Sequence, residues 1–241
     1  MEKRDSGFTL IELLVVISII ALLVSILMPA LAKSRERSRE LVCSINLRSI
    51  GTGLFLYLED NNDTTFNANF ANSFFWKDTN GNYLKPSSSS AYWGVAYIDY
   101  IDSQDVFSCP SFLRTAKLIY PVDPKLIEQA AFGLNSNANN KKISQVRRPG
   151  EFIFAHDHVE PKVENGSRDM FYNDGPGTNN LRSYRQGGSR EQFYRGIFRH
   201  STNSNKPFET GGKANMLWLD GHVDNLRETT GDDVRKKWYT G

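Results

Sequence analysis

The 241-residue sequence has little net charge and few cysteines. Its formal net charge is +2 at pH 7, so we expect no nucleic acid partner. Cys43 and Cys109 each lack a second cysteine nearby, which disfavours a zinc knuckle. The chain also lacks a P-loop, a dinucleotide-binding glycine pattern, a nucleophile elbow and an internal repeat of solenoid period. From these absences we do not expect an enzyme.

One long apolar segment is the dominant feature that the chain does contain. Residues 8–27 are apolar except for Thr9, Glu12, Ser18 and Ser25. In a helix such a segment is roughly 30 Å long, which matches the hydrocarbon core of a bilayer. A secretory signal peptide is disfavoured, because its small residues follow a shorter apolar core. The segment therefore predicts a membrane-spanning helix.

Two residues are unusual within this helix. Glu12 is ionisable, and a charge inside a membrane is costly, so a functional role is the first hypothesis. The alternative is a carboxylate that merely extends to the membrane surface. Pro29 lacks an N–H and clashes with the preceding turn, so it predicts a kink or local melting; a simple helix end is the alternative.

The sequence Gly7-Phe8-Thr9-Leu10-Ile11-Glu12 resembles the prepilin processing site of type IV pilins and type II secretion pseudopilins. The resemblance implies that a membrane peptidase cuts after Gly7 and that the new N-terminal residue, Phe8, is methylated. It implies that Glu12 is the assembly carboxylate, which would pair with the N-terminal ammonium of a neighbouring subunit. It also matches Pro29 to the proline that loosens the helix near the far membrane face.

The resemblance implies a pseudopilin-like subunit that assembles through its N-terminal helix into a type II secretion or type IV pilus-like filament. Its implied partners are the prepilin peptidase, other pilin-like subunits, an inner-membrane assembly platform and membrane lipid. The chain would cross the inner membrane once, with its head in the periplasm or outside the cell. Residues 33–39 carry four basic residues and one acid, so the positive-inside rule alone would place the rest of the chain in the cytoplasm. We give the processing motif precedence over that statistical rule.

We expect four segments: a leader (1–7), a transmembrane assembly helix (8–31), an outer helical half packed on the head (32–59) and a globular head (60–241). Within the outer half, one apolar stripe has helical spacing. Its members are Leu47, Ile50, Leu54 and Leu58, with Leu41 and Ile45 extending it. Gly51 and Gly53 either weaken this helix or mark close packing.

The head is expected to belong to the α+β class, with the helix packed on an antiparallel sheet. Strands are predicted at 151–157 and 193–199, and short helices at 124–132 and 231–239. Asp220-Gly221 lies between two extended runs and predicts a hairpin with a tight type I′ turn. Residues 160–192 are polar and glycine-rich and are expected to form a long loop.

The head offers a few candidate sites. Cys43 and Cys109 could form one disulfide or remain two buried thiols. His156 and His158 share one face of a strand, and with His200 and Asp220 they could hold zinc or iron. The alternative is that strand-end His and Asp side chains bond turns and caps.

No cofactor is required by these patterns. The acidic stretches 59–63 and 169–174 offer oxygen ligands for calcium but show no regular loop pattern.

Patches of the chain resemble one pseudopilin-like subfamily. They are the segment from Cys43 to Arg48, the triplet Cys109-Pro110-Ser111, and His200 followed by Asp220-Gly221-His222. In that subfamily nine residues usually separate the His from the Asp-Gly, whereas nineteen do so here. Two other functions stay open: a membrane-anchored extracytoplasmic binding module that reads a ligand with loop 160–192, and a metal-dependent enzyme that uses the His/Asp cluster.

Overall fold

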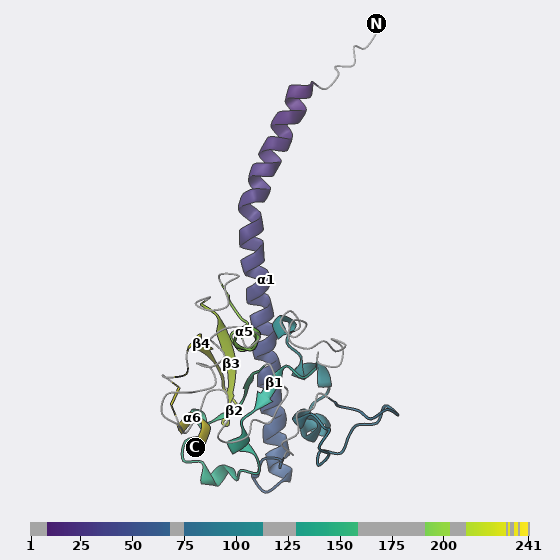
Figure 1. Cartoon of the computed structure of the whole chain (residues 1–241), viewed down its shortest axis with the longest axis vertical. Coiled ribbons are helices and arrows are strands. Elements are labelled where there is room, and N and C mark those ends of the chain that lie inside the picture. The colour runs from purple at the N-terminus through teal and green to yellow at the C-terminus, as the bar shows by residue number, and fades with distance from the viewer. Residues whose placement is uncertain are drawn as a thin grey trace.

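The computed structural model of the chain is a long helix that leads into a head of strands and short helices (Figure 1). It describes residues 9–67, 75–112, 129–158, 191–202, 211–229, 231, 234–235 and 237–240. The predicted processing residues Gly7 and Phe8 lie outside the described residues. So do the acidic stretch 169–174 and residues 160–190 of the predicted loop.

Helix α1 runs from Leu10 to Asp60 without interruption. Thr9 caps its start: the Thr9 hydroxyl accepts from the Glu12 N–H, and the Glu12 carboxylate accepts from the Thr9 N–H, which is a capping box. Pro29 lies inside the helix, so its interpretation as a helix end is wrong. The loss of one N–H bond is tolerated, and Figure 1 shows a rod that curves rather than breaks.

The two halves of α1 have different surroundings. All of residues 10–31 are exposed, and the exposure of their large apolar side chains ranges from 78% at Leu10 to 43% at Val24. Beyond them the helix buries one face against the head, formed by Glu40, Cys43, Leu47, Ile50, Gly51, Gly53, Leu54 and Leu58. The prediction that Leu41 and Ile45 extend this face is wrong, since they are 51% and 60% exposed. Counting back from Leu47 in steps of 3.6 reaches Cys43 and Glu40 instead.

The head contains a four-stranded antiparallel sheet in the order β1-β2-β3-β4. The strands are Phe132–Leu134, Ile153–Asp157, Lys213–Trp218 and Val223–Arg227. One sheet face, including Phe154 and Leu217, shares a core with α1. The other face carries a smaller core around Ile153, Met216 and Trp218. The predicted α+β architecture, a helix on an antiparallel sheet, is confirmed.

Two 3₁₀ helices, Trp93–Tyr100 and Gln104–Phe107, pack on α1 beside the sheet. Close packing explains the two glycines of α1. A Cβ on Gly53 would lie 2.4 Å from Ile101 Cγ1, and a Cβ on Gly51 would lie 3.0 Å from Leu217 Cδ1. The helix accepts a cost in propensity of about 1 kcal/mol per glycine because larger residues would push the head away.

Other local predictions need correction. Residues 193–199 were expected to form a strand, but α5 is a helix at Glu191–Ile197. Tyr194, Ile197 and Phe198 are buried in one cluster, and their spacing of three and four residues is helical. Of the predicted helix 124–132, residues 124–128 lie outside the described residues, and Phe132 begins β1. The last helix, α6, is confined to Lys237–Thr240.

The hairpin between β3 and β4 forms at Asp220-Gly221 as predicted, but with another turn type. A type I′ turn needs positive φ at both central residues, and of the turn residues only Gly221 has it, at +85°. The Gly221 N–H donates to the Trp218 carbonyl, and the Trp218 N–H donates to the His222 carbonyl. This is the three-residue hairpin with a type I turn and a left-handed glycine.

Gly221→Ala is predicted to destabilise the head much more than Gly81→Ala. Both glycines have φ near +85°, so both substitutions carry about 1 kcal/mol of backbone strain. A Cβ on Gly221 would also lie 2.5 Å from Phe55 Cε2 of α1, whereas a Cβ on Gly81 meets nothing within 4 Å. The Gly221 variant should therefore lose about 2–4 kcal/mol by denaturant titration. Equal losses in the two variants would show that the turn does not pack on α1.

Candidate functional site

The charged group of the apolar helix lies at its first turn. The Glu12 carboxylate accepts hydrogen bonds from the Thr9 N–H at 2.9 Å and the Thr9 hydroxyl at 2.7 Å. It is therefore folded back toward the N-terminal end of α1. Glu12 is exposed in the isolated chain, so a cation from a neighbouring molecule can reach it.

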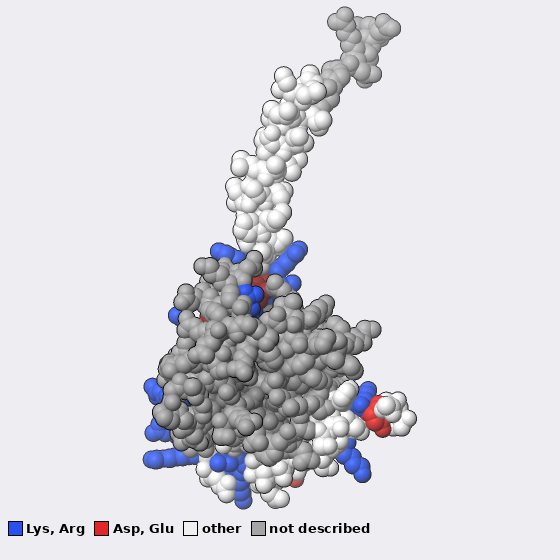
Figure 2. All heavy atoms as spheres, in the orientation of Figure 1, with Lys and Arg blue, Asp and Glu red and all other residues white. Residues whose placement is uncertain are grey.

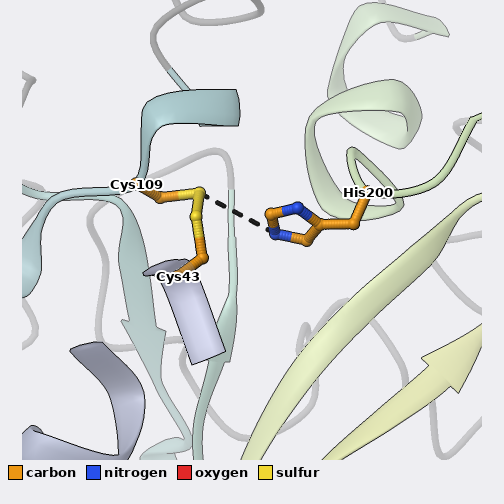
Figure 3. Close-up of side chains that lie close together, drawn as sticks. All are labelled: Cys43, Cys109 and His200. Carbon is orange, nitrogen blue, oxygen red and sulfur yellow. Dashed lines mark hydrogen bonds between the residues drawn. A yellow bond between two sulfur atoms is a disulfide. The ribbon is translucent and has the colours of Figure 1, made fainter. Parts of the chain in front are cut away.

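The outer half of α1 is joined to the head by a disulfide between Cys43 and Cys109 (Figure 3). Both cysteines are fully buried, and 66 positions separate them in the sequence. The Asn46 side chain donates to the Ser108 carbonyl at 2.8 Å, and the Ser111 hydroxyl donates to Glu36 at 3.3 Å. The helix thus holds the cysteine-containing loop on both sides of the disulfide.

His200 lies directly beside this disulfide, with its Nε2 3.8 Å from Cys109 Sγ (Figure 3). The same nitrogen is 3.0 Å from Asp157 Oδ2. Asp157 also accepts from the Arg199 guanidinium and from the Asn215 N–H, the latter at 2.7 Å. Asp157 and His200 are both fully buried. The disulfide therefore lies beside a buried network of charged and hydrogen-bonded groups.

Arg199 is the cation of this network. Its two terminal nitrogens donate to the carbonyls of Ala131, His158 and Gly196 at 2.8–3.0 Å, besides the Asp157 carboxylate. Its guanidinium also lies 5.0 Å from the centre of the Phe112 ring. Arg199 therefore satisfies carbonyls at the ends of three separate segments.

The network is held together by opposite charges. Burial raises the pKa of Asp157, but Arg199, His200 and the Asn215 N–H outweigh it, so the pKa is lowered below its ordinary value of 3.8. Burial lowers the pKa of Arg199, which the Asp157 carboxylate opposes. At neutral pH the pair is ionised, and each partner compensates the desolvation of the other.

The predicted four-ligand metal site is not formed. The rings of His156 and His158 lie 5.2 Å apart, as their shared strand face implied. His200, however, pairs with Lys213 at the start of β3, and Asp220 follows its end, roughly 17 Å away for a strand of this length. Asp220 instead accepts from His222 Nδ1 at 2.6 Å, a bond within its own turn. The four residues predicted as ligands of a metal-dependent enzyme therefore do not come together in one site.

Among the described residues, one group of three potential metal ligands comes together: Cys43, Cys109 and His200. Its two sulfurs are joined to each other in the disulfide. The acidic stretch 59–63 contributes to no such group within the described part of the chain.

The two parts of the His…Asp-Gly resemblance lie at opposite ends of β3, and both meet α1. His200 contacts the disulfide that begins on α1, and a Cβ on Gly51 would lie 3.4 Å from the Gly221 carbonyl. His200 and Lys213 exchange two backbone hydrogen bonds, at 3.1 and 2.8 Å. His200 is therefore paired with the start of β3 despite the longer spacing in the sequence.

Sequence reasoning missed Asp157, Arg199 and Glu40 as parts of this junction. Glu40, on α1, is 4% exposed. Its carboxylate accepts a hydrogen bond from the Ser201 hydroxyl, and its Oε1 lies 3.5 Å from Lys213 Nζ. The available signals were the helical phase of Glu40 with Leu47 and the adjacency of Arg199 to His200. No pattern indicated that Asp157 would face Arg199 across 42 positions of sequence.

Comparison with known proteins agrees with this architecture. Residues 3–28 match the family model described as the prokaryotic N-terminal methylation motif. The type IV wide pilus major component PilA4 of Thermus thermophilus is 37% identical over 97 residues. The alignment covers 39% of this chain and 74% of that relative. No solved structure matches the chain.

A long apolar helix that is uncovered in its first half and carries an antiparallel sheet on its second half defines a pilin-like fold. With the methylation motif and the PilA4 similarity, the chain belongs to the type IV pilin family. It is a pilin-like subunit with a prepilin N-methylation motif, and family membership implies assembly with other pilin subunits. The apolar helix fits a membrane-anchored protein.

Asp157→Asn is predicted to remove about 3–5 kcal/mol of stability at pH 7, because it leaves the buried Arg199 charge uncompensated. In the wild type, a lowered carboxyl pKa contributes stability above its unfolded value and loses it as pH falls, so stability should drop below about pH 4. The variant should show a shallower drop, with the remainder due to the other carboxyls of the head whose pKa is lowered, Glu40 and Glu151. Thermal melting of the full chain in detergent at pH 3–7 measures both effects.

Asp102→Asn, at an exposed position, is the matched control and should melt like the wild type at every pH. An Asp157 variant as stable as this control would contradict the buried ion pair.

Replacing both Cys43 and Cys109 by Ala is predicted to lower stability by about 4 kcal/mol, since the disulfide closes a loop of 66 positions. Reductant under denaturing conditions, followed by refolding, should lower the wild-type melting temperature toward that of the variant. The variant itself should not respond to reductant. A wild type that is equally insensitive would mean that the two thiols are not paired.

Proposed function

We propose that the chain is cut after Gly7, methylated at Phe8 and assembled through α1 into a type IV pilus-like filament. The observation that carries the proposal is the uncovered apolar surface of residues 10–31, all exposed in the isolated chain. Such a surface needs lipid before assembly and neighbouring helices after it. The similarity to a protein named as a pilus component supports a pilus-like filament over a secretion pseudopilus.

Glu12 supplies the specificity of assembly in this proposal. Inside an apolar layer its carboxylate requires a positive partner. Cleavage after Gly7 would create an ammonium at Phe8, and methylation leaves that nitrogen positive. The carboxylate already lies at the first turn of α1, so the ammonium of a neighbouring subunit is a partner of the right charge at the right depth. Pro29 would let the helix yield locally as it leaves the membrane.

The proposed partners are the prepilin peptidase and an inner-membrane assembly platform, in addition to other pilin subunits. The head would lie in the periplasm or outside the cell, after a single crossing of the inner membrane. In this proposal the role of the head is structural and requires no cofactor. The disulfide and the contacts of Glu40 with Ser201 and Lys213 support that role, because they join the head to α1.

The N-terminal peptide of the membrane-bound protein is predicted to begin at methylated Phe8. Mass spectrometry of the protein from cells with an active prepilin peptidase measures this directly. Glu12→Leu should still be processed but should reduce the amount of protein in sheared filaments at least tenfold, since an uncompensated ammonium opposes assembly.

Ser18→Leu is the matched control, because it also replaces a polar residue of the apolar helix by Leu, and it should assemble normally. A peptide that begins at Met1 would refute processing. Normal filaments of the Glu12 variant would refute the role of its carboxylate.

A further inference from the structure

Four basic residues follow the apolar segment of α1 directly: Lys33, Arg35, Arg37 and Arg39, here called the basic collar. Lys33 and Arg35 are exposed and have no carboxylate partner in the part of the chain that the structure describes. The Arg37 side chain is 62% exposed and that of Arg39 is 39% exposed. Figure 2 shows basic side chains projecting on both sides of the helix where it enters the head.

The acidic residues of the same stretch face the head instead. Glu36 accepts from Ser111 and pairs with Arg39 at 3.3 Å, and Glu40 pairs with Arg37 and with Lys213 of β3. At 100° per residue, Glu36 and Glu40 share the face of α1 that packs on the head. The collar residues occupy the two flanks, with Lys33 above Arg37 on one side and Arg35 above Arg39 on the other. Both flanks of this stretch are therefore positive.

The collar lies at the depth of lipid headgroups. At about 1.5 Å per residue, residues 10–31 span roughly 33 Å, which fills the hydrocarbon core. The collar begins two residues later and extends over roughly 9 Å more. The headgroup layer on each side of a bilayer is about 5–8 Å thick, so the collar crosses it while the head remains in water.

We propose that the basic collar binds the phosphates of anionic phospholipids in the leaflet nearest the head, and so fixes the depth of the subunit in the membrane before assembly. Each basic residue near an anionic surface adds roughly a fivefold factor to binding. Because Glu36 and Glu40 partly neutralise Arg39 and Arg37, Lys33 and Arg35 contribute most. The proposal also accounts for four basic residues on the side of the membrane where the positive-inside rule disfavours them. There they would bind lipid at the membrane surface nearest the head.

The full-length chain, purified in detergent, can be given equimolar phosphatidylglycerol and phosphatidylcholine and examined by native mass spectrometry. We expect the wild type to retain phosphatidylglycerol preferentially, and high salt to weaken that preference. In the variant K33Q/R35Q/R37Q/R39Q, the preference for phosphatidylglycerol over phosphatidylcholine should fall at least fivefold. The variant K33Q/R35Q, which disturbs no ion pair among the described residues, should lose most of that amount while melting like the wild type.

The matched control changes four exposed basic residues elsewhere on the head, as K77Q/K85Q/K142Q/R147Q. It removes the same charge and should keep the wild-type preference. An unchanged preference in K33Q/R35Q, or an equal loss in the control, would overturn the proposal. The measurement needs neither cleavage nor filament assembly, so its outcome is separate from that of the proposed function.

Discussion

The structure depends on one helix, α1, whose two halves suit different surroundings. The first half suits an apolar environment, and the second half suits the head on one side. Residues 10–31 of α1 present apolar side chains all round, whereas the following residues bury one face against the head and leave the opposite face exposed. A single helix can do this because the backbone hydrogen bonds stay within it in both environments. The head therefore has only one face of α1 on which to fold, and its core is built along Leu47, Ile50, Leu54 and Leu58.

Apolar packing alone would leave the head free to slide or rotate on such a regular surface. The buried polar groups remove that freedom, since each has partners in only one position. Glu40 of α1 must meet the Ser201 hydroxyl and Lys213 of β3, and Asn46 of α1 must meet the Ser108 carbonyl. The stabilisation from such a pair is modest, because desolvation offsets much of the attraction. We attribute to these helix-to-head contacts the register of the head on the helix, which the disulfide then fixes covalently.

The features that the sequence could predict are those with a strong local signal. The uncovered apolar segment, the buried stripe from Leu47 to Leu58, the strand that contains His156 and the hairpin at Asp220-Gly221 all have one. The failures occur where two periods compete or where the partner is distant in sequence. Residues 193–199 alternate, yet Tyr194, Ile197 and Phe198 also match a helix, and their common burial decided the outcome. The metal site failed because residue types say nothing of which end of β3 each ligand occupies.

The misassigned Leu41 and Ile45 fit a division of the helix between the head and the proposed filament. Both lie with Val42 on the face of α1 opposite the buried one, and they are 51%, 60% and 43% exposed. Apolar residues with helical spacing thus occur on two faces at this level, and only one of them belongs to the head. The other continues the uncovered surface of residues 10–31 past the basic flanks. A helix that ended its apolar surface at the membrane would need only the head-facing stripe. In the proposed filament, packing between neighbouring subunits would cover the second stripe.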